Sequence, residues 1–362
     1  MSNEQRIQQA IAQANSFATQ GKWDEALEAF NKILKYDPHH LDVRNAIIKI
    51  SIQKQDYEEV IHQHMDCAEI YMMRNEREES IKRYNQILRL EETVQQAPQG
   101  RGDAVTQVRS LVNQVKPEIY YQIGDFHLES KKFDVALQYL KKSQELAPGR
   151  WEIHMALGRV YMARENLRES IGEFQEVLRL APEESAQAYE MLGEIFVRQD
   201  RPQQQITIWF RNAAEAYVKK NNLKDACRVY ERMLQIDPNN KDVLNLLGEY
   251  YGRLHQKERA SQVLERLASI YEQEGNALDK VIQIYEQILQ QDPGQYQVAD
   301  KLIAIYQDII NRSPNQLSIR VRLVDHLQKA GKLDGLEDHY YAIATYNMVA
   351  RFLVALGVTP EH

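Results

Sequence analysis

The sequence predicts an all-α protein built as a solenoid of stacked helical units. A segment of amphipathic character occurs near the start at residues 23–38, where it reads WDEALEAFNKILKYDP, and it recurs with small changes. The other copies lie at residues 78–92, 133–148, 167–182, 223–238 and 278–293. A unit this short cannot bury its own apolar face, so neighbouring copies must stack and share a core. We therefore expect function on an extended surface and not in a buried catalytic pocket.

Composition supports the same fold class. The chain has 362 residues, with only 15 Gly and 10 Pro, and Tyr is its commonest aromatic residue. Few glycines and prolines favour long helices joined by short turns. Because each unit of a repeat array contacts only its neighbours, the length counts repeats and not separate globular domains.

Prolines at the ends of the copies measure the size of each unit, because a proline there cannot continue the helix. Pro148 and Pro182 are 34 residues apart, which is enough for two helices. From Pro182 to Pro238 and from Pro238 to Pro293 the intervals are longer by about 20 residues, or one further helix. Units of two helices and units of three helices are therefore expected. The middle helices of the three-helix units are predicted at residues 56–74, 202–220 and 256–274.

Within a two-helix unit, small and aromatic residues keep constant positions. In residues 151–184 the first helix carries His154, Leu157, Gly158 and Tyr161 on one stripe. Ser170, Phe174, Val177 and Pro182 follow on the second helix. This pattern resembles the tetratricopeptide repeat family over roughly residues 7–340. The resemblance implies a right-handed α-solenoid of helical hairpins that binds other proteins.

The array is expected to consist of four parts. Residues 1–92 form an N-terminal block, and residues 93–116 form a linker and a short helix. The segment around residues 91–103 contains two glycines and a proline, which predicts a loop, and residues 104–115 predict the short helix. Residues 117–335 form the central array, and residues 336–362 form an apolar C-terminal helix or cap.

The resemblance also indicates which side chains face the concave groove, because positions two, five, nine, twelve and thirteen of each first helix usually do so. The expected partner-binding residues are Tyr121, Asp125, Met155, Arg159, Met162, Glu190, Glu194, Arg211, Glu215, Asn245 and Glu249. Aromatic and methionine surface beside carboxylates suits a protein or peptide with apolar anchors and basic residues. The alternative is that these side chains only keep the surface soluble. The Lys and Asn set with which some family members clamp a C-terminal carboxylate is absent.

Charge and composition exclude several other classes. The net charge is −7 with dispersed Lys and Arg, so nucleic acid is not expected as a partner. Neither a signal-peptide core nor a stretch of 18 apolar residues is found, so we expect a cytoplasmic protein. Cys67 and Cys227 are expected in the core. The spacing of His64 and Cys67 is compatible with a shared face, but both fit core positions, so no metal, cofactor or catalytic residue is predicted.

The C-terminal segment is unusually apolar for the end of a solenoid, since terminal repeats normally need a polar outer face. A possible docking patch consists of Tyr341, Met348, Phe352 and Leu356. Three alternatives remain open for this segment: burial over the preceding helix, self-association or partner docking, and membrane insertion, which its shortness and Arg351 disfavour.

Together these observations predict a non-enzymatic scaffold or adaptor that binds a protein or peptide on its surface. Two alternatives belong to other classes. In the first, the chain is a structural subunit that forms homo-oligomers through its C-terminal helix. In the second, it is a regulatory subunit of an enzyme complex whose catalysis lies on another chain.

Overall fold

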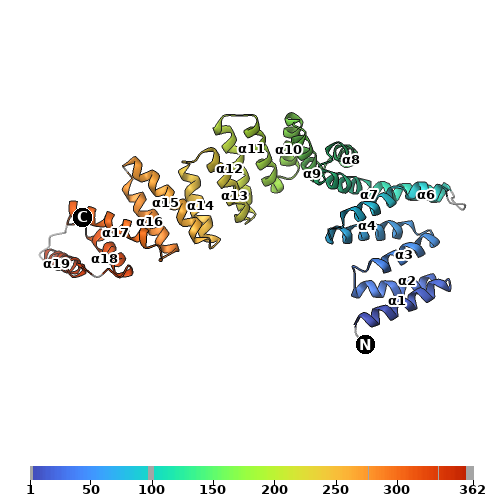
Figure 1. Ribbon diagram of the computed structural model, residues 1–362, viewed down its shortest axis with the longest axis horizontal. Helices are drawn as coiled ribbons and strands as arrows, with labels where there is room; N and C mark the ends of the chain where they lie inside the picture. The colour runs from blue at the N-terminus through green and yellow to red at the C-terminus, as the bar shows by residue number, and fades with distance from the viewer. Residues whose placement is uncertain (1–2, 97–101, 276, 333, 356–362) are drawn as a thin grey trace. The chain divides into compact units, whose positions relative to one another are not determined.

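The computed structural model describes residues 3–96, 102–275, 277–332 and 334–355, and this part of the chain contains helices and turns without any strand. It divides into two compact units, residues 1–188 and residues 189–362, which we treat separately (Figure 1). The all-α repeat fold is thus confirmed. The predicted block boundaries at residues 92, 116 and 335 stay a prediction.

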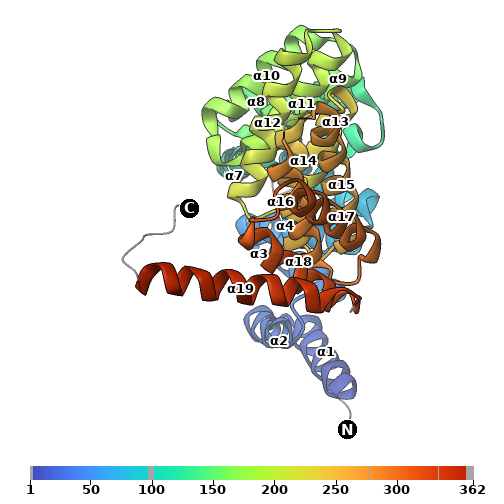
Figure 2. The same cartoon turned by 90° about the vertical axis from the view of Figure 1, so that its left-hand side faces the viewer.

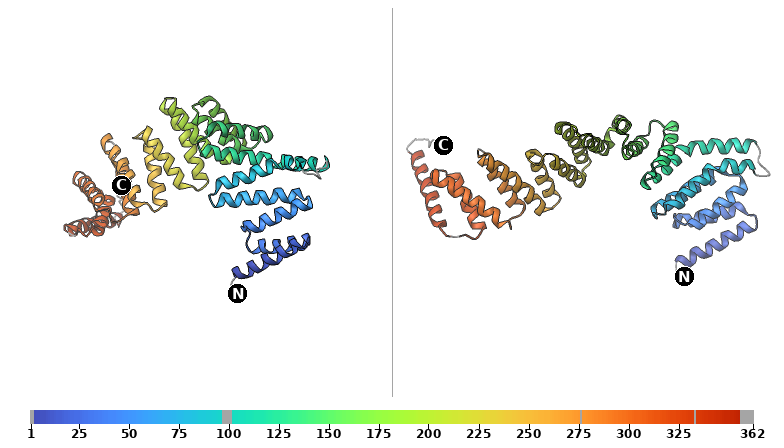
Figure 3. Two further views of the ribbon diagram at one scale, coloured as in Figure 1. Left: turned by 45° about the vertical axis from the view of Figure 1, so that its right-hand side comes forward. Right: turned by 45° about the horizontal axis from the view of Figure 1, so that its top comes forward.

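Successive helices of the first unit run up and down, and each packs on its neighbours in the sequence (Figure 3). Short turns join them, and in several turns one residue has a positive φ, such as Gln55 at 61° and Lys131 at 57°. The helices of this unit are α1 Asn3–Thr19, α2 Trp23–Tyr36, α3 Leu41–Lys54, α4 Tyr57–Met73, α5 Arg77–Leu88, α6 Leu90–Gln96, α7 Gly102–Glu129, α8 Phe133–Leu146, α9 Trp151–Ala163, α10 Leu167–Leu180 and the 3-10 turn η1 Pro182–Glu184.

The second unit repeats the same arrangement after α11 (Ser185–Arg198), the helix in which the two units meet along the chain. Side-chain caps mark some of its helix starts: Asn222 accepts a hydrogen bond from the Asp225 N–H, and Asn240 accepts one from the Val243 N–H. The helices of this unit are α12 Gln203–Lys219, α13 Leu223–Ile236, α14 Lys241–Arg253, α15 Lys257–Glu274, α16 Leu278–Gln291, α17 Tyr296–Arg312, α18 Leu317–Lys329 and α19 Leu336–Ala355.

The three predicted middle helices are confirmed as α4, α12 and α15. Helix α4 packs on both α3 and α5, and α15 packs on both α14 and α16. Helix α12 packs on α13, and its Phe210 lies against Gly193 of α11. A helix with two partners needs a wide apolar stripe, and in α4 the buried side chains include Val60, Ile61 and Cys67.

Glycines on the first helices allow the paired helix to approach closely, as expected from the repeat pattern. A Cβ atom added at Gly158 would lie only 2.6 Å from Cε1 of Phe174, and one at Gly124 would lie 2.6 Å from Cγ of Leu140. Both partners are fully buried. The glycine is therefore required by packing, because no larger side chain fits without moving the opposite helix.

The linker prediction was wrong in two respects. Residues expected to begin a loop form the short helix α6, while residues 97–101 lie outside the described part of the chain. The short helix expected at residues 104–115 does not end before Pro117. It is the first half of α7, a helix of 28 residues in all that continues through this proline. Val112 and Ile119 on either side of Pro117 are buried in the same cluster, so packing along both halves of α7 offsets the hydrogen bond that proline removes.

The tyrosine excess has a structural explanation in the second unit. Tyr306 of α17 is fully buried and donates a hydrogen bond of 2.6 Å to Glu286 of α16, which Arg322 of α18 approaches to 3.3 Å. Tyr251, Glu231 and Arg259 form an equivalent set from α14, α13 and α15. In both sets burial raises the pKa of the tyrosine, which therefore stays a neutral donor. Each set joins three successive helices across the repeat boundary.

Candidate functional site

The predicted partner-binding residues differ widely in exposure. Met155 and Met162 are buried, with 6% and 8% of their surface exposed, so they offer a partner little contact area. Tyr121, Asp125 and Arg159 are half-buried, and the last two approach each other to 3.9 Å. The exposed members of the set are Arg211, Glu215, Asn245 and Glu249.

Glu190 and Glu194 are engaged in bidentate ion pairs within the second unit. Arg228 donates to both carboxylate oxygens of Glu190, and Tyr217 adds a third hydrogen bond. Arg232 donates from Nε and Nη2 to Glu194 at 2.8 and 3.0 Å. These carboxylates are therefore neutralised by α13 and add little negative potential toward a basic partner. The sequence placed them on the right helix but could not reveal their arginine partners, 38 residues away.

A groove of about 1160 Å³ lies on the first unit and is lined by residues of α1 to α6. Its deeper wall is apolar, with Phe30, Ile48 and Leu90 buried, and its outer part is polar or cationic. We call it the N-terminal groove, and its lining includes Trp23, Asn45, Lys49, Ile52, Arg83 and Arg89. None of these six was predicted as a partner-binding residue.

The positional rule would have found five of the groove's lining residues if it had been applied to α3. Counting from Leu41, the five groove positions are Asp42, Asn45, Lys49, Ile52 and Gln53, and all five line the N-terminal groove. Arg83 of α5 and Arg89 at the C-terminal end of α5 carry no such signal. They reach the groove because the three-helix unit of α3, α4 and α5 adds an extra helix beside it.

Arg83 is held in position at the groove. Its Nη2 donates to Oδ1 of Asn45 at 2.8 Å, and its guanidinium lies 5.8 Å from the centre of the Tyr71 ring. His64 also lines the groove but is 92% buried; burial and the neighbouring Arg83 lower its pKa to about 4. The imidazole is therefore neutral at pH 7, and the cations of the groove are those of Lys and Arg.

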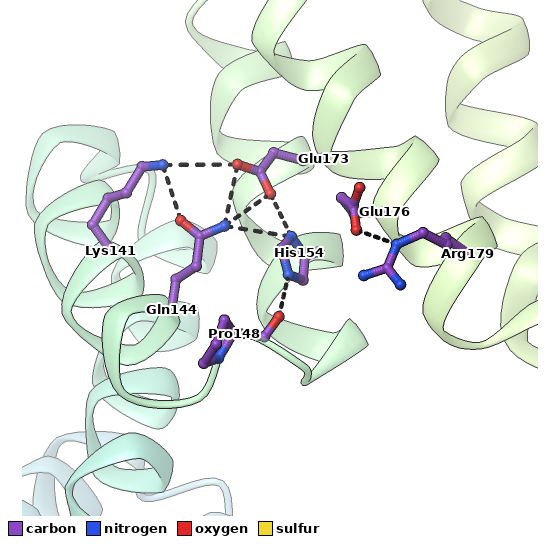
Figure 4. Close-up of polar contacts among 7 residues, drawn as sticks. All are labelled: Lys141, Gln144, Pro148, His154, Glu173, Glu176 and Arg179. Atoms are coloured by element: carbon purple, nitrogen blue, oxygen red, sulfur yellow. Dashed lines mark hydrogen bonds and ion pairs between the residues drawn. The ribbon is translucent and has the colours of Figure 1, made fainter.

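A second polar cluster lies between α8, α9 and α10 and is centred on His154 of α9 (Figure 4). The His154 Nδ1 lies 2.6 Å from Glu173, and Nε2 lies 3.0 Å from the carbonyl oxygen of Pro148. Both partners are acceptors, so both ring nitrogens carry a proton when both bonds form. The hydrogen bond to Glu173 accordingly raises the pKa of His154.

Further donors complete the shell of Glu173. Gln144 Nε2 lies 3.2 and 3.4 Å from the carboxylate oxygens, and Lys141 Nζ lies 3.8 Å from Oε1 (Figure 4). Because His154 and Glu173 are largely buried and face each other, the cluster has the character of a structural ion pair. It clamps the second helix of one repeat to both helices of the next.

Among the described side chains of the C-terminal helix α19, the buried ones lie near its start. Leu336 is buried and Ile343 packs against the preceding core, whereas Figure 2 shows the helix extending beyond α18. Tyr341 and Met348 of the predicted docking patch are 76% and 69% exposed. The side chain of Phe352 and all of Leu356 lie outside the described residues.

Cys67 and Cys227 are buried, as predicted for core residues, and burial raises the pKa of both thiols. The described ranges contain no group of three or more His, Cys, Asp or Glu side chains able to hold a metal ion. Among the helices described, none has both the length and the apolar character needed to span a membrane.

Helical hairpins that stack in sequence order, with glycines at the crossing points, define an all-α repeat protein. Models of the tetratricopeptide repeat match residues 9–40, 117–150, 155–217 and 210–244. The chain therefore contains tetratricopeptide repeats in these segments.

The chain is also similar to individual proteins. It is 24% identical over 223 residues to the BBSome complex member BBS4 homolog of Drosophila melanogaster, and the match covers 51% of this chain and 46% of that protein. It thus spans about half the length of this relative. Among solved structures, the TPR domain of P58(IPK) shares 13% identity with a TM-score of 0.31, covering 94% of this chain and 93% of that one. MamA shares 18% identity with a TM-score of 0.30, covering 57% and 96% of the two chains.

Proposed function

We propose that the protein is a non-enzymatic scaffold that holds a segment of a partner protein in the N-terminal groove. The observation that carries this proposal is the groove itself, which combines exposed apolar side chains, Trp23 and Ile52, with polar and cationic ones. Apolar side chains of a partner would supply most of the affinity, and the polar and cationic groups would select its orientation. The repeats support the general role, because tetratricopeptide repeats serve as protein-binding surfaces.

The exposed residues predicted in the second unit remain part of this proposal as a further contact surface. Arg211, Glu215, Asn245 and Glu249 are accessible, whereas Glu190 and Glu194 would have to break their ion pairs to bind a partner. The similarity to a BBSome complex member, whose name places it in an assembly, favours a role within a larger complex. Cytoplasmic location is proposed on the sequence alone.

The proposal can be tested by site-specific photo-crosslinking. A photoreactive residue at Ile52, which is 44% exposed in the groove, should give a discrete adduct in an extract of the source organism. The matched control carries the same residue at Leu146 on α8, which is 52% exposed and outside the groove. Adducts at both positions alike, or at neither, would contradict the groove as the binding surface.

Self-association through α19 is the second candidate, favoured by the exposure of Tyr341 and Met348. Exposed apolar side chains on one helix face mark contact surfaces. If copies of the chain associate there, changing both residues to Asp should reduce the mass measured by light scattering to that of one chain. A mass that is unaffected by the double substitution would eliminate this candidate.

A further inference from the structure

The N-terminal groove has a charge opposite to that of the chain that carries it. The chain has a formal net charge of −7, yet the groove is lined by Lys49, Arg83 and Arg89 against a single carboxylate, Asp42. A concave surface lined by one sign of charge concentrates its field within the concavity. The groove is therefore a local positive site on an acidic protein.

These three cations are not neutralised by the protein itself. Within the described residues, no carboxylate lies within 4.0 Å of the side-chain nitrogens of Lys49, Arg83 or Arg89. Other cations of the same unit are paired: Arg44 binds Asp66, and Arg109 lies 2.6 Å from Glu91. The groove thus gathers three cations without an ion pair, although other cations of the described part of this unit, such as Lys35 and Lys131, are unpaired outside it.

The three side chains also differ in exposure and in hydrogen bonding, in a way that suits recognition of carboxylates. Arg83 is half-buried and oriented by Asn45, whereas Lys49 and Arg89 are exposed at the rim. A held guanidinium pre-organises part of a site, and flexible cations at the rim can adapt to carboxylates at several spacings. Trp23 and Ile52 add exposed apolar surface beside them.

We propose that the N-terminal groove binds an acidic peptide segment of a partner protein, with carboxylates at Lys49, Arg83 and Arg89 and apolar side chains against Trp23 and Ile52. This inference rests on the proposed function and names the chemistry of the partner. It differs from the basic partner expected from the sequence, because that expectation relied on carboxylates of another region, two of which are paired with arginines.

Peptide is favoured over nucleic acid as the source of the negative charge. The apolar surface that the groove exposes belongs to Trp23 and Ile52, which suit leucine-like anchors, whereas Phe30 is fully buried behind it. Nucleic-acid sites need basic residues that track a backbone over a longer path, and here the cations are confined to one groove.

The test measures binding of three synthetic peptides that differ only in charge. Each carries Leu at every third or fourth position and a fluorescent label, with Glu, Gln or Lys at the remaining positions. By fluorescence anisotropy at about 0.05 M salt, the Glu peptide should bind about tenfold more tightly than the Gln peptide and the Lys peptide least. The difference should shrink at about 0.5 M salt because exposed charges are then screened.

A pair of matched variants assigns the preference to the groove. Lys49→Glu with Arg89→Glu should abolish the preference for the Glu peptide, since both side chains are exposed and their loss leaves the packing intact. The control, Lys35→Glu with Lys131→Glu, makes the same change in net charge at exposed positions outside the groove and should preserve the preference. Arg83→Gln tests the oriented cation separately, with circular dichroism to verify folding.

Several outcomes would overturn the proposal: equal binding of the three peptides, stronger binding of the Lys peptide, the same loss in the control variant, or equal affinity for a single-stranded oligonucleotide of matched charge. These results are distinguishable from failure of the proposed function. If the photo-crosslink at Ile52 still captures a partner while the Glu peptide shows no preference, the groove binds proteins and its acidic specificity is wrong.

Discussion

At the scale of single residues, His154 shows how one substitution in a repeat pattern creates a pH-dependent contact. The groups that face it are Glu173 and Glu176 from α10, together with Gln144 and Lys141 from α8 (Figure 4). Glu173 raises the pKa of His154 above its ordinary value of 6.5. The contact therefore contributes stability fully below about pH 6.5 and loses it as pH rises through the folded-state pKa.

Changing His154→Gln should accordingly destabilise the first unit more at about pH 5.5 than at about pH 9, with a difference of roughly 1 kcal/mol in the free energy of unfolding. Urea unfolding at both pH values measures it. His127→Gln serves as control, because burial lowers the pKa of His127 and its pH dependence has the opposite sign. An equal effect of His154→Gln at both pH values would show that the imidazole is not charged in the folded protein.

At the scale of secondary-structure elements, α7 is the clearest departure from expectation. Pro117 interrupts the backbone hydrogen bonds of a helix that nevertheless continues. Val108 and Val112 before the proline and Ile119 and Ile123 after it are buried in the same cluster. A proline inside a helix costs roughly 3 kcal/mol. The carbonyl oxygen of Pro117 itself accepts a hydrogen bond of 2.6 Å from the Ser143 hydroxyl, which joins α7 to α8.

Pro117→Ala should stabilise the first unit by about 2 kcal/mol, after allowance for the greater freedom of the unfolded chain. The substitution supplies an N–H to the preceding turn and leaves the Ser143 hydrogen bond available. Thermal unfolding measures the change, and Pro38→Ala, in a turn between helices, is the control in which no helical hydrogen bond is gained. A lower melting temperature for Pro117→Ala would mean that the proline sets a bend that the packing requires.

The elements themselves were largely predictable, whereas the site was not. Proline spacing located α4, α12 and α15 because helix length follows directly from residue count. The Pro117 boundary failed because local propensity was overridden by burial on both sides of the proline. The charge of each candidate surface depends on which distant side chains meet. In the second unit the pairing of Arg228 with Glu190 has no signal in local spacing, and in the groove the approach of Arg83 to Asn45 has none.

At the scale of the whole molecule, stability is distributed along the array. Each hydrophobic cluster of the described residues lies within one of the two units, and the helices of a unit contact their neighbours in sequence. Such an array behaves as a row of coupled elements and not as one globular core. A destabilising substitution should therefore lower the local stability of its own helix and of the helices packed against it, and affect distant helices much less.

Leu302→Ala in the second unit tests this expectation, because Leu302 is fully buried between α16, α17 and α18. The cavity should cost roughly 2–5 kcal/mol locally. Amide hydrogen exchange followed by mass spectrometry should rise strongly in α16, α17 and α18 and much less in α12 and α13, whose side chains form another cluster. Met233→Ala in that other cluster is the reciprocal control, with the larger increase in α12 and α13. Equal increases across all these helices for both variants would mean that the unit unfolds as one cooperative block, and that the stacked repeats do not keep separate local stabilities.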